Sequence, residues 1–484
     1  MQMLLVAAIL GRFLCAFAVY MGIPAVWAGL AGLDCWRQLA AAAALTGGGG
    51  ALLLAGGKSD ESVGIREGFA IVAGAWGFAS LFGALPYLFT GVAATWLDAF
   101  FESVSGLTTT GATVIQSLEA VPAPVLLWRS MTQWLGGMGI IVLFIVFLPQ
   151  LGVGAFHLFK AEVPGPVAGR VVPHIRDTAG ALWKIYLFLT LSELGLLMLA
   201  GMNFFDALNY ALATVATGGF ATADAGVQHY DSPLIEGILT VFMIIAGANF
   251  TLFYLAWRRG VNRIFADSEV RAYLAIIAAA TLLITANLTL AAGQPPVQAL
   301  RDALFQVASL ITSTGFVSTD FDQWPPLSKL LLLLLMFIGG CSGSTAGAIK
   351  VSRLLILCKQ SWAELRKAIH PRIVTSIQLD GRTVDTAVIT AVSQFFFIYL
   401  LLFSAGVLVM AGTGMQPFDA MGAVAAALGN VGTGFGVVGP TTTYSSVAPL
   451  GKLVLSICML LGRLELITLL VFLRAEFWRS HKGW

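Results

Sequence analysis

Long stretches of uncharged, apolar residues recur along the whole chain, and they restrict the fold more than any other feature of the sequence. Each stretch reaches the length of about 20 helical residues that crosses the hydrocarbon core of a bilayer. Of the 484 residues, 58% are hydrophobic and only 11% are charged, whereas about 25% are charged in an ordinary soluble protein. Backbone polar groups in lipid must be paired within the chain, so these segments are expected to be helices. The sequence therefore predicts an all-α polytopic membrane protein and excludes a water-soluble globule.

Ten spans can be placed, and an even number puts both termini on the same side of the membrane. The first span follows no basic start and no cleavage site, so it is predicted to be retained. Between some spans lie apolar segments too short to cross and too rich in glycine for a plain helix, such as 98–113 and 419–436. The predicted spans are 3–33, 38–57, 68–90, 124–158, 182–202, 234–257, 272–292, 326–357, 387–411 and 447–473.

One short pattern occurs four times in these glycine-rich segments. An Asp is followed 13 residues later by a Gly, in the pairs Asp98 and Gly111, Asp206 and Gly219, Asp302 and Gly315, and Asp419 and Gly432. Four matches in register, each between spans, indicate a repeated unit of span, half-helix, glycine turn and span. The predicted parts are an N-terminal transmembrane helix pair at 1–62, repeat 1 at 63–160, repeat 2 at 161–260, repeat 3 at 261–360 and repeat 4 at 361–484.

The repeated unit itself suggests an ion filter. An Asp before an apolar, Ala-rich run is typical of a helix N-cap, and about 10 helical residues reach only halfway through a membrane. Non-helical backbone at that depth must be buried in protein or line a water-filled cavity. Four such turns around one axis would present a ring of carbonyl oxygens, which can replace the hydration shell of an alkali cation. Glycine suits the turns because it adopts positive φ freely.

Three segments carry a resemblance to a known family: Phe101–Thr113, Thr132–Gly139 and Gly339–Gly347. They resemble the TrkH family, the membrane subunits of bacterial Trk potassium uptake systems, within the wider Trk/Ktr/HKT superfamily. The resemblance covers nearly the whole chain. It implies four M1-P-M2 repeats (span, pore half-helix, filter loop, span) around one pore, plus two extra N-terminal transmembrane helices.

The resemblance also implies which residues form the potassium filter. Gly111 in the first repeat resembles the potassium-selective rather than the sodium-transporting members. Asn430 in the fourth repeat and the added Gly218 in the second depart from a uniform T-x-G pattern, so the four-fold site is expected to bind fewer ions or to select less sharply. The implied filter residues are Thr109, Thr110, Gly111, Thr217, Gly218, Gly219, Ser313, Thr314, Gly315, Asn430, Val431 and Gly432.

A glycine-rich run interrupts the span of the third repeat. Lys350 lacks the spacing of a phosphate-binding loop, and small residues packing one helix against another are an open alternative. The resemblance instead implies a broken helix whose middle, 339–347, lies across the pore below the filter as a gate. Ser342, Ser344 and Thr345 would satisfy the freed backbone groups. The implied gating residues are Gly339, Gly340, Ser342, Gly343, Ser344, Thr345, Gly347 and Arg463.

Three of the charged residues within predicted spans are candidates for a special role: Glu193, Arg463 and Glu465. Charge at that depth is costly and is a functional candidate by default. Arg463 is either paired structurally with a nearby acid or, by resemblance, a cation below the filter that repels potassium when the pore is shut. Glu465 lies on another helix face, so it is not expected to pair with Arg463. For Glu193 a structural ion pair is favoured over a role in the pathway.

Charge placement predicts the orientation. Acidic residues outnumber basic ones on the side of the half-helices, and the other side holds most Lys and Arg. Basic loops face the cytoplasm, so the filter is expected to face outward and both termini to be cytoplasmic in a bacterial inner (plasma) membrane. An acidic vestibule would concentrate cations before entry. The alternative is that the four repeated Asp residues serve only as helix caps.

The basic connectors 162–184, 258–271 and 350–382, with an amphipathic helix expected near 361–369, fit positive-inside topology and anionic lipid. By resemblance, the protein is a homodimer docked on a cytosolic ring of TrkA-type nucleotide-binding subunits, and these loops face that ring. No nucleotide site is visible in the chain itself, so no bound cofactor is expected and a nucleotide would act only through the partner. The net charge of +2 argues against nucleic acid.

The predicted function is potassium uptake through a selective pore gated by a cytosolic partner. Two alternatives use the same pore: proton- or sodium-coupled potassium symport, and less selective sodium and potassium transport. An inverted-repeat transporter is disfavoured because the four units run in one sense. An enzyme is disfavoured because the spans carry few charges and no polar catalytic cluster, and neither the five His nor the five Cys show metal-binding spacing.

Overall fold

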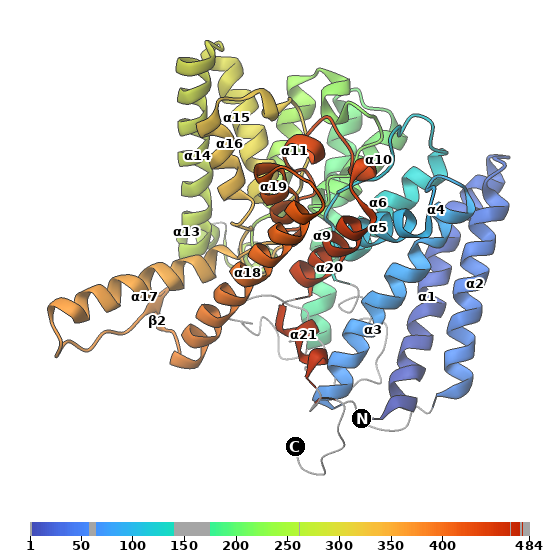
Figure 1. Ribbon diagram of the computed structural model, residues 1–484, viewed down its shortest axis with the longest axis horizontal. Helices are drawn as coiled ribbons and strands as arrows, with labels where there is room; N and C mark the ends of the chain where they lie inside the picture. The colour runs from blue at the N-terminus through green and yellow to red at the C-terminus, as the bar shows by residue number, and fades with distance from the viewer. Residues whose placement is uncertain are drawn as a thin grey trace.

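The computed structural model describes residues 2–57, 64–139, 175–260, 262–464, 466–474 and 477, and nearly all of its regular structure is helical. The chain begins with two long helices that pack along each other, α1 (Met3–Leu30) and α2 (Trp36–Gly56). Gly11 and Gly50 let the two backbones approach closely, because a Cβ at Gly11 would meet the carbonyl oxygen of Gly50. This pair stands at one side of the molecule (Figure 1).

Four successive groups of helices follow the first pair. The first group holds α3 (Ile65–Gly83), α4 (Leu85–Phe89), α5 (Trp96–Leu107) and α6 (Ala123–Gly137). The second holds α9 (Ile175–Leu199), α10 (Phe204–Val215), α11 (Pro233–Ala246) and α12 (Phe250–Arg259). The third holds α13 (Asn262–Ala266), α14 (Ser268–Ala292), α15 (Pro296–Ile311), α16 (Pro326–Leu335) and α17 (Val351–Ile369). The fourth holds α18 (Thr386–Gly412), α19 (Pro417–Leu428), α20 (Pro449–Arg463) and α21 (Leu466–Leu470).

Short elements join these helices. A two-stranded antiparallel hairpin of β1 (Gln378–Leu379) and β2 (Arg382–Thr383) lies between α17 and α18. It projects from the body together with α17 (Figure 1). The single-turn 3₁₀ helices are η2 (Gly226–Tyr230), η3 (Phe321–Gln323), η4 (Gly436–Val438), η5 (Tyr444–Ser446) and η6 (Val471–Leu473).

The structure confirms an all-α polytopic membrane protein. Among the described residues, six helices are long and apolar enough to cross a bilayer, and a seventh span is possible if the bent pair α11 and α12 is counted as one. The outer helices α2, α9, α14 and α18 leave most of their apolar surface uncovered by protein, as lipid-facing helices do. The spans α3, α9, α14 and α18 are each followed by a short apolar helix that is largely buried: α5, α10, α15 and α19.

Three of the predicted spans are wrong as continuous helices. The predicted span 234–257 is two helices bent by 92° at Gly247–Asn249. Span 326–357 ends as a helix at Leu335, and only its last residues, from Val351, are helical again. They begin α17, which also contains the amphipathic segment expected near 361–369. Span 447–473 breaks after Arg463. Glycines lie at or beside all three breaks, where they favour the departure from helix. The part of span 124–158 beyond residue 139 lies outside the described residues.

The four predicted half-helices are present as α5, α10, α15 and α19, of 12, 12, 16 and 12 residues. The prediction that their repeated Asp residues are N-caps is wrong. Asp98 and Asp206 are the third helical residues, and the caps are Thr95 and Asn203, whose side chains accept the backbone N–H of these Asp residues. Asp419 is likewise the third residue of α19, and Asp302 lies in the middle of α15. The carboxylates of Asp98 and Asp206 instead accept hydrogen bonds from the cap side chains.

Candidate ion pathway

The four turns after the half-helices share one unusual backbone conformation. Each repeated glycine has a φ between 77° and 85°, and the residue two positions earlier has a φ between 53° and 55°. For a residue with a Cβ this left-handed conformation is uncommon and costs free energy. Its occurrence at the same place in all four segments shows that they are structurally equivalent. The non-glycine residues concerned are Thr109, Thr217, Ser313 and Asn430, and the glycines are Gly111, Gly219, Gly315 and Gly432.

The four glycines form a closed ring, which we call the glycine ring. A Cβ built on each would collide with a carbonyl oxygen of the next repeat: Gly111 with Gly218, Gly219 with Thr314, Gly315 with Val431, and Gly432 with Thr110. Each of these oxygens belongs to the residue just before the next repeated glycine. The last contact returns from the fourth repeat to the first, so the four turns surround one axis in chain order. A side chain at any of these positions would have to displace backbone atoms.

Side chains from neighbouring elements fix the ring. The amide of Asn430 donates to the Thr110 hydroxyl at 3.0 Å and to the Met459 carbonyl at 2.9 Å. The Tyr444 hydroxyl donates to the Gly432 carbonyl at 2.7 Å, and the Thr433 hydroxyl donates to the Gly315 carbonyl at 2.7 Å. These bonds join elements far apart in sequence, so they hold the turns in the positions that the ring requires.

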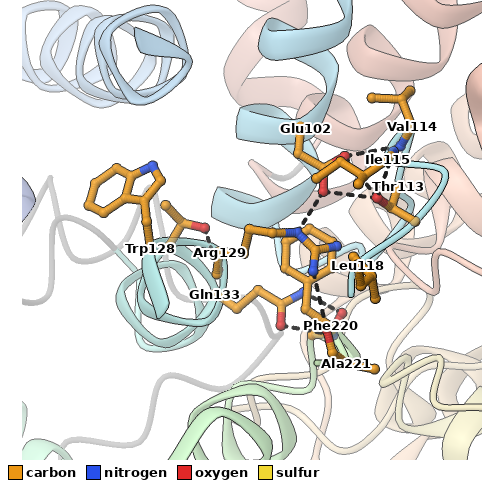
Figure 2. A network of polar contacts seen from close by, with 12 residues as sticks. Glu102, Thr113, Val114, Ile115, Leu118, Trp128, Arg129, Gln133, Phe220 and Ala221 are labelled. Carbon is orange, nitrogen blue, oxygen red and sulfur yellow. Dashed lines mark hydrogen bonds and ion pairs between the residues drawn. The ribbon is translucent and has the colours of Figure 1, made fainter. Parts of the chain in front are cut away.

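The second turn is fixed by one side chain of the first repeat. Gln133 on α6 donates to the Gly218 carbonyl at 2.5 Å and accepts from the Phe220 backbone N–H at 3.1 Å (Figure 2). It thus satisfies backbone groups on both sides of Gly219. The added glycine of this repeat has a steric reason, since a Cβ on Gly218 would collide with the Gln133 side chain.

A buried ion pair lies just outside the ring (Figure 2). Arg129 Nε donates to Glu102 Oε1 at 2.9 Å, and the two side chains are 1% and 0% exposed. Glu102 also accepts from the Thr113 hydroxyl and from the Val114 N–H, at 3.0 Å each. Arg129 donates to the Ala221 carbonyl at 3.2 Å and lies over the Phe220 ring. The pair joins the chain after Gly111 to the chain after Gly219. Sequence reasoning missed it, because nothing in the spacing of these two residues signals a contact.

Three further ion pairs or carboxylate contacts join neighbouring repeats on the same side. Lys452 binds Asp98 at 2.6 Å, joining the fourth repeat to the first, and Arg301 binds Glu236 at 2.6 Å, joining the third to the second. Asp322 accepts the Gly436 N–H at 2.8 Å. Partial burial raises the pKa of Asp322, although this bond favours the charged form. Three of the acidic residues on this side, Asp98, Glu102 and Glu236, are thus paired with basic side chains.

The run Gly339–Gly347, which we call the intramembrane loop, is not helical. Its ends are joined at Ile338 and Ile349, where Gly339 N–H donates to the Ile349 carbonyl at 2.8 Å. Packing of small residues within a continuous helix is therefore excluded. The Ser344 hydroxyl donates to the loop's own Cys341 carbonyl at 2.6 Å. Ser342 bonds instead to the hydroxyl of Ser352.

The intramembrane loop lies against the inner side of the glycine ring. Gly347 N–H donates to the Ser313 hydroxyl at 2.6 Å, and a Cβ on Gly347 would meet the Gly429 carbonyl oxygen. Thr345 donates to the Val215 carbonyl at 3.1 Å, at the end of half-helix α10. The loop therefore contacts the second, third and fourth repeats directly beside the four turns. Gly340 and Gly343 also pack closely, against Gly247 and Asn249 at the break between α11 and α12.

Arg463 joins the loop to two other elements. Its guanidinium donates to the Thr345 carbonyl at 2.7 Å, and to the carbonyls of Gly136 and Gly137, at the end of α6, at 2.5 and 2.7 Å. The sequence placed Arg463 below the filter, and the structure puts it beside the loop. These three contacts are all to backbone carbonyls.

Glu193 and Glu465 are the other two charged residues that the sequence singles out within spans. Glu193 is fully buried on α9 and forms no ion pair with any described residue, so the expected structural pair is not found there. Glu465 lies outside the described residues, as do residues 162–174 of the first basic connector.

Comparison with known proteins identifies the family. A family model described as cation transport protein, TrkH, matches residues 38–480. Two relatives named Trk system potassium uptake protein TrkH come from Halomonas elongata, 41% identical over 418 residues, and Escherichia coli K12, 42% identical over 421 residues. Each alignment covers 86% of this chain and 86% of the relative.

A solved structure agrees with this assignment. The crystal structure of the potassium transporter TrkH from Vibrio parahaemolyticus superposes with a TM-score of 0.89 at 38% identity, covering 99% of this chain and 100% of that one. With a family model over most of its length and relatives above 40% identity, this chain belongs to the TrkH family of cation transport proteins.

Proposed function

We propose that this protein takes up potassium across the bacterial inner membrane through one selective pore. The closed glycine ring carries the proposal, because carbonyl oxygens gathered around one axis can replace the hydration shell of an alkali cation. The negative C-terminal ends of α5, α10, α15 and α19 point toward the same region and favour a cation. The name shared by the relatives, potassium uptake protein, supports potassium as the ion. The filter is formed by the twelve residues predicted from the sequence. The four repeat units are 63–160, 161–260, 261–360 and 361–484, and 1–62 is the additional N-terminal helix pair.

The gate consists of the intramembrane loop and Arg463. The loop lies against the inner side of the ring, where an ion leaving the filter must pass. Arg463 adds a positive charge at the same depth, held against the loop by the Thr345 carbonyl. Opening therefore requires the loop and this guanidinium to move together.

The assembly and the orientation complete the proposal. The filter faces outward and both termini are cytoplasmic, in keeping with the positive-inside rule. The protein works as a homodimer on a TrkA-type nucleotide-binding ring, as membership of a Trk system suggests. The chain is a transporter without enzymatic activity or a bound cofactor, and a nucleotide acts only through the partner.

Rubidium flux into liposomes containing the purified protein tests this function. A passive pore carries rubidium down its own gradient, and imposed proton or sodium gradients change the flux only through the membrane potential. Flux that requires a proton or sodium gradient at fixed potential would establish coupled symport instead. The absence of rubidium flux under every gradient, in protein with an unchanged melting temperature and with the cytosolic partner added, would overturn the proposal.

A further inference from the structure

A buried carboxylate closes the intramembrane loop from the cytosolic side. Glu269, in the first turn of α14, is 6% exposed. Its Oε1 accepts the Ser342 N–H at 2.7 Å and the Ser352 N–H at 2.9 Å. Ser342 belongs to the loop and Ser352 to the first turn of α17, so one oxygen holds the two segments together. Hydrogen bonds to a charged acceptor are stronger than those between neutral groups.

A second contact connects this carboxylate to the projecting hairpin. Asp380, in the turn between β1 and β2, accepts the N–H of Ser268 at 2.9 Å, and Ser268 is the residue before Glu269. The turn is tight, with φ of 48° at Asp380 and 74° at Gly381. The hairpin is also bonded to α17, where Lys359 donates to the Gln378 carbonyl at 2.7 Å. A continuous path therefore runs from the exposed hairpin through the start of α14 to the loop.

We propose that Glu269 is a positioning residue that holds the intramembrane loop closed, and that Asp380 sets the position of Glu269, so that displacement of the hairpin releases the loop. This regulation rests on the proposed pore. Moving the start of α14 away from α17 stretches one or both bonds to Glu269. The loop then loses its anchor at Ser342 while its bond to Ser313 beside the filter stays intact.

Two measurements on the full chain in liposomes or nanodiscs test the linkage. Amide hydrogen exchange over 340–353 reports loop closure without requiring transport, and rubidium uptake without added partner reports opening. For Glu269→Ala we expect faster exchange at Ser342 and Ser352 and uptake raised about tenfold, the size expected from losing one or two charge-assisted hydrogen bonds. Glu269→Gln keeps one acceptor oxygen without the charge, so both effects should be smaller.

Asp380 variants separate the linkage from general destabilisation. Asp380→Ala should shift exchange and uptake in the same direction as Glu269→Ala, whereas Asp380→Asn keeps the accepting oxygen and should resemble the parent. Asp385→Ala is the matched control, because it removes a cap contact to Ala387 on the same projecting segment without touching α14. The double variant Glu269→Ala with Asp380→Ala should change exchange and uptake no more than Glu269→Ala alone, since both residues act on one path.

The outcomes separate this proposal from the proposed function. If exchange over 340–353 is unchanged in both Glu269 variants, or if Asp380→Ala behaves like Asp385→Ala, the linkage is wrong. If Glu269→Ala only lowers the melting temperature and Glu269→Gln opens nothing, the carboxylate is structural. A parent protein and variants that carry no rubidium at all would overturn the pore, while the exchange data would still decide the linkage.

Discussion

Four residues in the turns after the half-helices have a positive φ although they carry a Cβ. Sequence reasoning predicted positive φ at the repeated glycines but not at Thr109, Thr217 and Ser313, because threonine and serine carry no left-handed preference. Asn430 is the one that could have been found, since asparagine visits this conformation more readily. Its amide also donates to Thr110 and Met459. Asn430 in the fourth repeat therefore forms the same turn as Thr109 and Thr217, and its amide adds two hydrogen bonds.

The buried pair of Glu102 and Arg129 gives a prediction about stability. Removing one partner of a buried ion pair leaves an uncompensated charge, so Arg129→Leu should destabilise the protein by about 3 to 5 kcal/mol. Lys367→Ala is the control, because its pair with Glu364 is largely exposed and surface pairs contribute about 0 to 1 kcal/mol. Thermal unfolding in detergent measures both. Equal melting temperatures for the two variants would contradict the structural importance given to the buried pair.

The sequence pattern indicates some helices of the repeats and not the breaks within others. The half-helices were visible because their length and glycine turns repeat at a fixed spacing. The break between α11 and α12 was missed, although Gly247 precedes Asn249, which caps α12 through the Thr251 N–H at 2.9 Å. In an apolar segment this signal is weak, since a run of the same composition also fits a straight span. The repeated Asp residues resemble caps in the sequence because Asp is a favoured N-cap residue, but Thr95 and Asn203, three residues earlier, fill that position in α5 and α10.

Arg463, the last residue of α20, places a positive charge beside the intramembrane loop. Arg463→Ala should raise basal potassium conduction and leave selectivity nearly unchanged, because one cation facing a narrow path opposes another by a few kcal/mol at an effective dielectric constant of about 20. Its carbonyl contacts lie below the glycine ring. Vesicle flux and thermal unfolding on the same preparation test this. A variant that melts early and conducts no more than the parent would leave Arg463 as a structural residue.

The intramembrane loop itself gives a complementary prediction. Deleting Gly343 and Ser344 removes the contact of Gly343 with the Phe250 N–H but spares the bond between Gly347 and Ser313. Flux should rise and depend less on the cytosolic partner, because a shorter loop covers less of the pathway. Rubidium uptake with and without the partner measures both effects. A shortened variant that folds normally yet carries less ion would make the loop a scaffold.

At the scale of the whole molecule, the repeats close into a circle that the sequence could only partly predict. The spacing predicts four equivalent units, but not which unit touches which. The closing contacts join distant parts of the chain: Lys452 binds Asp98 at 2.6 Å, and the Tyr444 N–H donates to the Thr113 carbonyl at 2.8 Å. Such pairs depend on the folded geometry of both ends, so no local pattern reveals them. Within that circle the four turns are equivalent in backbone conformation and in their contact with the next repeat.

The potassium-to-sodium permeability ratio of four single variants tests this claim most directly. Gly111→Ser, Gly219→Ser, Gly315→Ser and Gly432→Ser each place a Cβ against a carbonyl oxygen of the next repeat. Gly293→Ser is the matched control, because Gly293 also has a positive φ, of 67°, but has no atom within 4 Å of an added Cβ. In liposomes, each of the four ring variants should lose preference for potassium, and the control should keep it. An unchanged ratio in any folded, conducting ring variant would show that its glycine is not part of the filter.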